Sequence, residues 1–130
     1  MKRFTISVLV VFVLFATSAF SGQQNLDFSW NQKISSDFAG WKIYKSNAPN
    51  VAVSAANVFM TVFYTGSAQT EYKANKELIV SDGQESIYYF VITAFDKNGN
   101  ESDKSNEVGI TVDFQPPDAP YTLRVVIKAE

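Results

Sequence analysis

The chain has 130 residues, of which 46% are hydrophobic and 15% aromatic, enough for one domain with a well-filled core. It contains neither cysteine nor histidine, which excludes disulfides, thiolate metal sites, and catalysis by a cysteine nucleophile or a histidine base. Its formal net charge is −2, whereas nucleic-acid-binding proteins usually have an excess of basic residues. We therefore expect no nucleic acid among its partners.

The first 21 residues have the features of a secretory signal peptide. Two basic residues supply a positive start, residues 6–16 form an apolar run, and Ala19 and Ser21 occupy the −3 and −1 positions of a cleavage site. The alternative is an uncleaved membrane anchor, but the run is shorter than the roughly 20 residues that span a bilayer. We therefore predict a secreted, periplasmic or cell-envelope protein, whose contact with a membrane is limited to an uncleaved N-terminal segment.

Seven segments are predicted as strands, most of them because apolar and polar residues alternate with a period of two. They are residues 26–30, 41–45, 58–64, 71–80, 87–94, 108–112 and 121–127. A short helix over 69–77 is the alternative for the fourth segment. Turn-forming residues separate the segments at intervals of about ten residues, which favours an all-β sandwich of about seven antiparallel strands, with 121–127 as an extra C-terminal strand.

The segment 58–64 has apolar side chains on both faces, which indicates a strand covered on both sides or an edge strand with an exposed apolar face. One interpretation is an aromatic platform for sugar binding, formed by Trp41, Phe59, Phe63 and Tyr64. The other places Trp41 and one face of the strand in the core. In that case Phe59 and Phe63 are left as a candidate partner surface at a sheet edge.

Five oxygen-bearing residues have the spacing of positions 1, 3, 5, 7 and 12 of an EF-hand calcium loop: Asp96, Asn98, Asn100, Ser102 and Glu107. Position 6 is Glu101, where that loop needs glycine, and the flanking segments are strands rather than helices. We therefore predict a turn built on the Asn98-Gly99 step, with no metal and no cofactor. The remaining carboxylates show no spacing that selects a catalytic pair, so we expect no enzyme.

Four of these segments resemble the fibronectin type III family. Trp30 matches the buried tryptophan of the family's second strand, and residues 40–46 (GWKIYKS) resemble its third strand. Residues 88–96 resemble the sixth strand, and residues 98–108 resemble the loop and seventh strand of bacterial members. The resemblance covers residues 26–112. It implies an immunoglobulin-like sandwich that acts as a spacer or as an interaction surface for proteins or carbohydrates.

The chain departs from this family at the first strand. Only residues 22–25 separate the predicted cleavage site from Leu26, which is too short for the strand that normally precedes the tryptophan strand. Residues 117–125 (PDAPYTLRV) resemble the opening of such a domain and so supply the missing element at the other end. Alternating apolar residues make this segment a second candidate partner surface: Tyr121, Leu123, Val125 and Ile127.

We divide the chain into a signal peptide (1–21), a fibronectin type III-like domain (22–114), and a proline-rich connector with a C-terminal strand (115–130). That strand either completes its own sandwich, completes a neighbour's by strand exchange, or is the remnant of a tandem array. We expect an exported, non-catalytic interaction or adhesion module of the cell envelope or extracellular space, which binds a protein partner or itself. The alternatives are a self-assembling subunit of a surface filament or virion, and an accessory carbohydrate-binding domain.

Overall fold

The computed structural model describes residues 21–81 and 83–128, so the predicted signal peptide, apart from Ser21, lies outside the described residues. The described chain is all-β. Its strands are β1 (Ser21–Trp30), β2 (Phe38–Ser46), β3 (Val58–Phe63), β4 (Tyr72–Ser81), β5 (Glu85–Asp96) and β6 (Val108–Asp113). The short 3-10 helix η1 (Ala55–Asn57) precedes β3. No helix in this part of the chain is long and apolar enough to cross a membrane.

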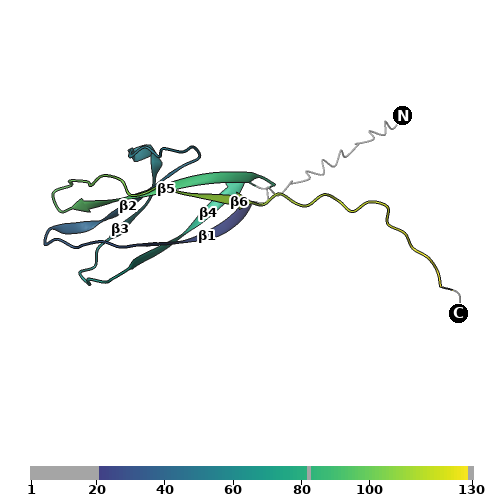
Figure 1. Cartoon of the computed structure of the whole chain (residues 1–130), viewed down its shortest axis with the longest axis horizontal. Coiled ribbons are helices and arrows are strands. Elements are labelled where there is room, and N and C mark those ends of the chain that lie inside the picture. The colour runs from purple at the N-terminus through teal and green to yellow at the C-terminus, as the bar shows by residue number, and fades with distance from the viewer. Residues whose placement is uncertain (1–20, 82, 129–130) are drawn as a thin grey trace, which may run out of the picture.

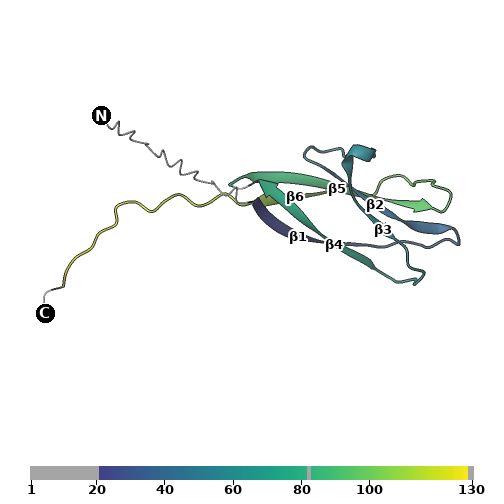
Figure 2. The same cartoon turned by 180° about the vertical axis from the view of Figure 1, so that it is seen from behind.

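The strands form two antiparallel sheets (Figure 1, Figure 2). One sheet contains β1 and β4, which pair without a register shift from Ser21 opposite Ser81 to Trp30 opposite Tyr72. The other sheet has the order β3-β2-β5-β6. The helix considered for residues 69–77 is wrong, because β4 occupies most of that segment.

Side chains from both sheets meet in one core. Leu78 and Val80 of β4 are buried against Ile43 of β2 and against Tyr88 and Phe90 of β5. Because successive side chains of a strand point to opposite faces, the alternation along the strands turns one apolar face of each sheet toward this core. The described residues therefore form the two-sheet, sandwich-like fold that the alternation predicted.

Aromatic side chains fill the core where β1 ends. Trp41 is 3% exposed and packs against Phe38, Tyr64 and Tyr72, with the ring centroids of Trp41 and Tyr72 4.7 Å apart. Trp30 of β1 joins this group, edge-on to Trp41 at 5.2 Å. This cluster ties β1 to the other sheet, since rings at these separations attract one another beyond the effect of their buried area.

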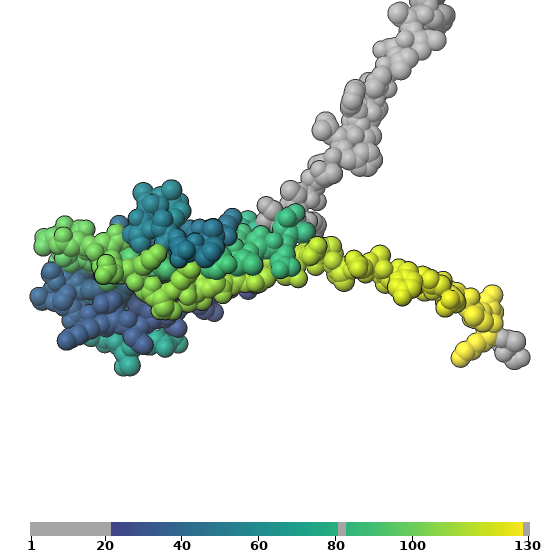
Figure 3. All heavy atoms as spheres, turned by 45° about the horizontal axis from the view of Figure 1, so that its top comes forward, coloured from purple at the N-terminus to yellow at the C-terminus, as the bar shows by residue number. Residues whose placement is uncertain are grey.

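The C-terminal segment differs from the expectation. Beyond Phe114 the described chain contains no strand, and residues 115–128 run away from the domain as an exposed, extended segment (Figure 1, Figure 3). The described residues thus contain six strands rather than about seven, and the extra strand expected at 121–127 is absent from the single chain. Its apolar residues contact no other part of the domain that would hold them in a sheet.

Candidate functional site

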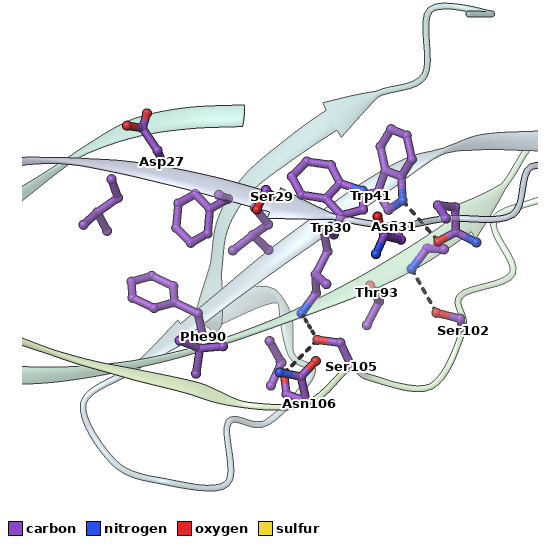
Figure 4. A pocket seen from close by; sticks show the side chains of 18 of the residues that line it. Asp27, Ser29, Trp30, Asn31, Trp41, Phe90, Thr93, Ser102, Ser105 and Asn106 are labelled. Atoms are coloured by element: carbon purple, nitrogen blue, oxygen red, sulfur yellow. Dashed lines mark hydrogen bonds between the residues drawn. The ribbon is translucent and has the colours of Figure 1, made fainter. Parts of the chain in front are cut away.

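A cleft of about 760 Å³ lies between the two sheets along β1 (Figure 4). Residues 25–32, eight in succession, form one wall. Leu26, Phe28 and Trp30 contribute the apolar part of this wall because they alternate with polar residues on the strand. Phe90 of β5 lies across the cleft from them. The cleft is therefore an opening in the side of the hydrophobic core.

The edge of β1 beside this cleft is free. β4 pairs with one side of β1, and no strand of the described residues pairs with the other side. The amide and carbonyl groups on that side consequently have no ladder partner. An unpaired edge next to an apolar opening is a site at which an extended segment adds as a further strand.

The part of the opposite wall that β5 forms does not offer such an edge. Where β5 extends beyond β6, the loop that follows β5 satisfies its backbone: the amides of Ile92 and Ala94 donate to the hydroxyls of Ser105 and Ser102, at 3.0 and 2.9 Å. The amide of Ser105 donates in turn to the carbonyl of Ile92, and the amide of Ser102 to the carbonyl of Ala94. Figure 4 shows both serines on the wall facing β1. Strand addition to β5 is thereby blocked along residues 92–94, whereas β6, whose Val108 and Ile110 also line the cleft, is an edge strand of its sheet like β1.

The two tryptophans at the end of the cleft differ in hydrogen bonding. The indole N–H of Trp41 donates to Oε1 of Gln32 at 3.2 Å. The indole N–H of Trp30 is buried and has no partner among the described residues. A buried donor without an acceptor is destabilising, by about 1–3 kcal/mol. Trp30 thus brings an unsatisfied donor to the strand whose edge is free.

The predicted partner surface at residues 58–64 is divided by a β-bulge. Ile43 is opposite Met60 and Tyr44 is opposite Val58, so Phe59 is the extra residue of β3. The bulge turns Phe59 inward, where its ring packs edge-on against Phe90 at 5.6 Å. Phe63, by contrast, is 70% exposed. The structure does not bring Phe59 and Phe63 together on one surface.

The aromatic platform considered for sugar binding is also not formed. Trp41 lies in the core, and Tyr64 packs edge-on against it and against Tyr72. Of the four rings, only that of Phe63 is exposed, and it lies edge-on to Phe95 with the centroids 6.1 Å apart. A single ring of this kind does not make a stacking surface for a sugar.

The residues with calcium-loop spacing serve the turn instead. The carboxylate of Asp96 accepts hydrogen bonds from the amides of Asn98 and Asn100, both at 2.9 Å, and from the side chain of Asn100. These bonds hold the pKa of Asp96 below its ordinary value. In the described residues no group of three or more acidic side chains is placed to hold a metal ion.

Glu107, the last residue of that spacing, faces elsewhere. Its carboxylate accepts hydrogen bonds from the amides of Val51 at 2.8 Å and Asn50 at 3.2 Å, and the bond from Val51 is the main reason that its pKa lies below the ordinary value. Lys104 donates to the carbonyl of Val51 at 3.0 Å. Together these contacts fasten the loop before β3 to the loop before β6, with Val51 fully buried between them.

Glu101 has a role in the structure that its place in the calcium-like spacing does not indicate. Its carboxylate accepts hydrogen bonds from the hydroxyls of Tyr44 and Thr93, two residues that are buried on the outer face of the larger sheet. Burial opposes ionisation of Glu101, but these bonds and the charge of Lys42 hold its pKa below the ordinary value. The contact is long-range, so no local motif could have revealed it.

The residues predicted on the C-terminal segment are the most exposed apolar side chains described. Tyr121, Leu123, Val125 and Ile127 are between 85% and 93% exposed. Thr122 has a φ of 59°, so the segment is not a regular strand in the single chain. The structure places neither this segment nor Phe63 at the β1 cleft, the side of the domain on which the sequence predicts a missing strand beside Leu26.

Comparison with known proteins gives no relative from which a function follows. No protein-family model, no curated protein and no solved structure matches the chain. The resemblance to fibronectin type III domains is therefore carried by sequence motifs and strand order alone.

Proposed function

We propose that this protein is an exported, non-catalytic interaction module, which binds an extended segment of a protein partner by strand addition at the free edge of β1. The observation that carries this proposal is the coincidence of an unpaired strand edge with a cleft of about 760 Å³, on whose β1 wall the apolar Leu26, Phe28 and Trp30 alternate with polar residues. Main-chain hydrogen bonds to the edge supply affinity in this mode of recognition, and the pockets beside the edge select side chains.

The fibronectin type III assignment belongs to the same proposal. Trp30 is on β1, residues 40–46 are on β2 and residues 88–96 are on β5, in the order that the family motifs require. If β1 is the second strand of such a domain, β2 to β6 are the third to the seventh. A first strand would lie next to its sequence neighbour β1, which is where the cleft is found.

Export and the lack of catalysis are supported by the sequence. The signal-peptide pattern of residues 1–21 supports secretion or a location in the periplasm or cell envelope. A chain without histidine and cysteine has few of the side chains that usually act as base or nucleophile. The opening along β1 is apolar at Leu26, Phe28 and Trp30, a lining that suits a hydrophobic side chain better than a reacting polar group.

A display screen with random extended peptides tests this function. The bait is the mature chain, residues 22–130, in which all four alternating apolar residues of the C-terminal segment are replaced by serine: Tyr121, Leu123, Val125 and Ile127. We expect the enriched peptides to alternate apolar and polar residues, and to shift the backbone amide NMR signals of residues 25–32. A screen that enriches nothing, or peptides that shift other residues instead, would overturn the proposal.

A further inference from the structure

We propose that the strand which fills the β1 cleft is residues 121–128 of a second copy of this chain, so that the protein assembles by strand exchange. This inference rests on the proposed strand-addition function and names its partner. The occupant and the acceptor edge are then both parts of the same sequence. Each copy would accept one C-terminal segment and donate its own.

The two segments are similar in length and in pattern. The cleft is lined by eight consecutive residues, 25–32, and the alternating segment predicted as a strand, 121–127, has seven. A strand added beside β1 directs alternate side chains to the same face as Leu26, Phe28 and Trp30. The donor has an apolar residue at every second position to occupy that face: Tyr121, Leu123, Val125 and Ile127.

Charge on the other face is complementary. Asp27 of β1 points away from the cleft interior (Figure 4) and has no ion-pair partner among the described residues. The donor's outward positions include Arg124 and Lys128, and residues 121–128 contain no acidic side chain. Opposite charges on neighbouring strands of one face attract, whereas like charges repel. The outward face of the donor is therefore suited to the acidic position on β1.

The donor also exposes apolar surface that exchange would remove from water. Each of its four inward residues is at least 85% exposed in the single chain, which is unusual for consecutive alternating positions in a soluble protein. At the acceptor, the added backbone would satisfy the free amide and carbonyl groups of β1. Both surfaces gain from the same contact, which is the condition for strand addition between copies.

The position of the donor favours a second copy over its own domain. β6 ends at Asp113, opposite Glu85, where β5 begins. β4 ends at Ser81, shortly before Glu85, and Ser81 is opposite Ser21, where β1 begins. The chain therefore leaves the domain at the end where β1 begins. It points away from the domain there (Figure 3). To reach its own β1 it must reverse direction within residues 115–120.

Such a reversal is opposed by the composition of that connector. Three of its residues are prolines, Pro116, Pro117 and Pro120, which favour an extended backbone. After reversal the segment would run parallel to its own β1. A segment from another molecule needs no reversal and can approach β1 antiparallel, which is the more stable pairing per residue.

Sedimentation velocity on the mature chain, residues 22–130, tests the inference over a wide range of concentration. We expect concentration-dependent assembly of the native chain. Val125→Ser removes an inward side chain of the donor and should raise the dissociation constant roughly tenfold or more. Val126→Ser is the matched control, since it removes the same side chain from the adjacent outward position, and it should change the constant by less than about twofold.

A mixing experiment identifies the acceptor. The isotope-labelled chain with serine at all four inward donor positions cannot donate but retains β1. Unlabelled native chain should then shift its amide signals at residues 25–32, and unlabelled Val125→Ser chain should do so much less. Shifts confined to other residues would overturn the inference.

The remaining outcomes also decide the question. A native chain that is monomeric at every concentration overturns strand exchange, whether its donor segment is free or protected against its own β1. Equal assembly of Val125→Ser and Val126→Ser overturns it as well, because a different interface then holds the copies together. In these cases the proposed function still stands if displayed peptides bind residues 25–32. Failure of strand exchange is thus distinguishable from failure of peptide binding at β1.

Discussion

The ring of Phe114 lies directly against Gly22: a Cβ atom on Gly22 would be only 2.4 Å from Cδ2 of Phe114. The residue that follows β6 therefore closes over the beginning of β1. The amide of Phe114 also donates to the carbonyl of Gln84 at 3.1 Å. Phe114 is thus the last anchored residue of the domain, and the C-terminal segment is released immediately after it.

Two glycine substitutions are expected to destabilise the fold by different amounts. A Cβ at Gly40 would lie 2.3 Å from the carbonyl oxygen of Val62, a backbone atom that moves only if the β2–β3 pairing shifts. At Gly22 the obstacle is the ring of Phe114, which can rotate. We expect Gly40→Ala to lower the free energy of unfolding by about 3 kcal/mol and Gly22→Ala by about 1 kcal/mol. Urea denaturation measures both, and an equal loss would contradict this assignment.

The two phenylalanines of β3 should behave differently on truncation. Phe59 packs edge-on against Phe28 and Phe90, so Phe59→Ala should lower the free energy of unfolding by roughly 3 kcal/mol. Phe63 packs edge-on against Phe95 and is largely exposed, so Phe63→Ala should lower the free energy of unfolding by about 1 kcal/mol or less. Thermal unfolding of both variants checks the prediction. Similar losses of stability in the two variants would mean that the β-bulge does not place Phe59 in the core and Phe63 on the surface.

Stability should depend on Glu107 in the acid range. Its folded-state pKa is below the ordinary 4.5, chiefly because of the hydrogen bond from the Val51 amide. Its contribution is therefore present above pH 4.5 and is lost as the pH falls through the lower, folded-state value. Glu107→Gln should lower the urea midpoint at neutral pH, and the difference from the native chain should shrink in acid. Glu77→Gln, which removes an exposed carboxylate, is the control and should show no such convergence.

Alkaline stability should report the contact of Tyr44 with Glu101. Burial first, and then the hydrogen bond to and charge of Glu101, raise the pKa of Tyr44 from 10.0 to about 12. The neutral phenol is thus favoured in the folded state, so its contribution is complete below pH 10 and is lost as the pH rises to about 12. The native chain should lose stability across this range more steeply than Tyr44→Phe. Tyr121→Phe, at an exposed position, should match the native chain.

The strand pattern is the part of the fold that local sequence could predict. The predicted strands lie close to the observed bounds for five of the six, and the segment 71–80, for which a helix over 69–77 was the alternative, is the strand β4. Alternation works because the side-chain period of a strand is two, whatever its partner is. Alternation within one strand does not reveal which residues of a neighbouring strand lie opposite it. For this reason it could not show the extra residue in β3 that turns Phe59 inward and Phe63 outward.

The candidate site was only partly accessible from sequence. The short interval before Leu26 indicated that a strand is missing, and the alternation at 121–127 indicated a strand with no assigned place. The cleft itself, the free edge of β1 and the unpaired N–H of Trp30 depend on which strands are neighbours. Such contacts join residues far apart in the chain, as the bond between Tyr44 and Glu101 also does.

The sequence by itself determined that the chain alternates as strands, lacks histidine and cysteine, and carries an apolar segment after a run of prolines. Those properties are local or compositional, so they need no knowledge of partners. Only the tertiary structure decided that β1 has one strand partner rather than two within residues 21–81 and 83–128, and that the C-terminal segment leaves the domain at the end where β1 begins. Strand pairing is set by long-range contacts between whole sheets, and these decide which backbone edge is left free.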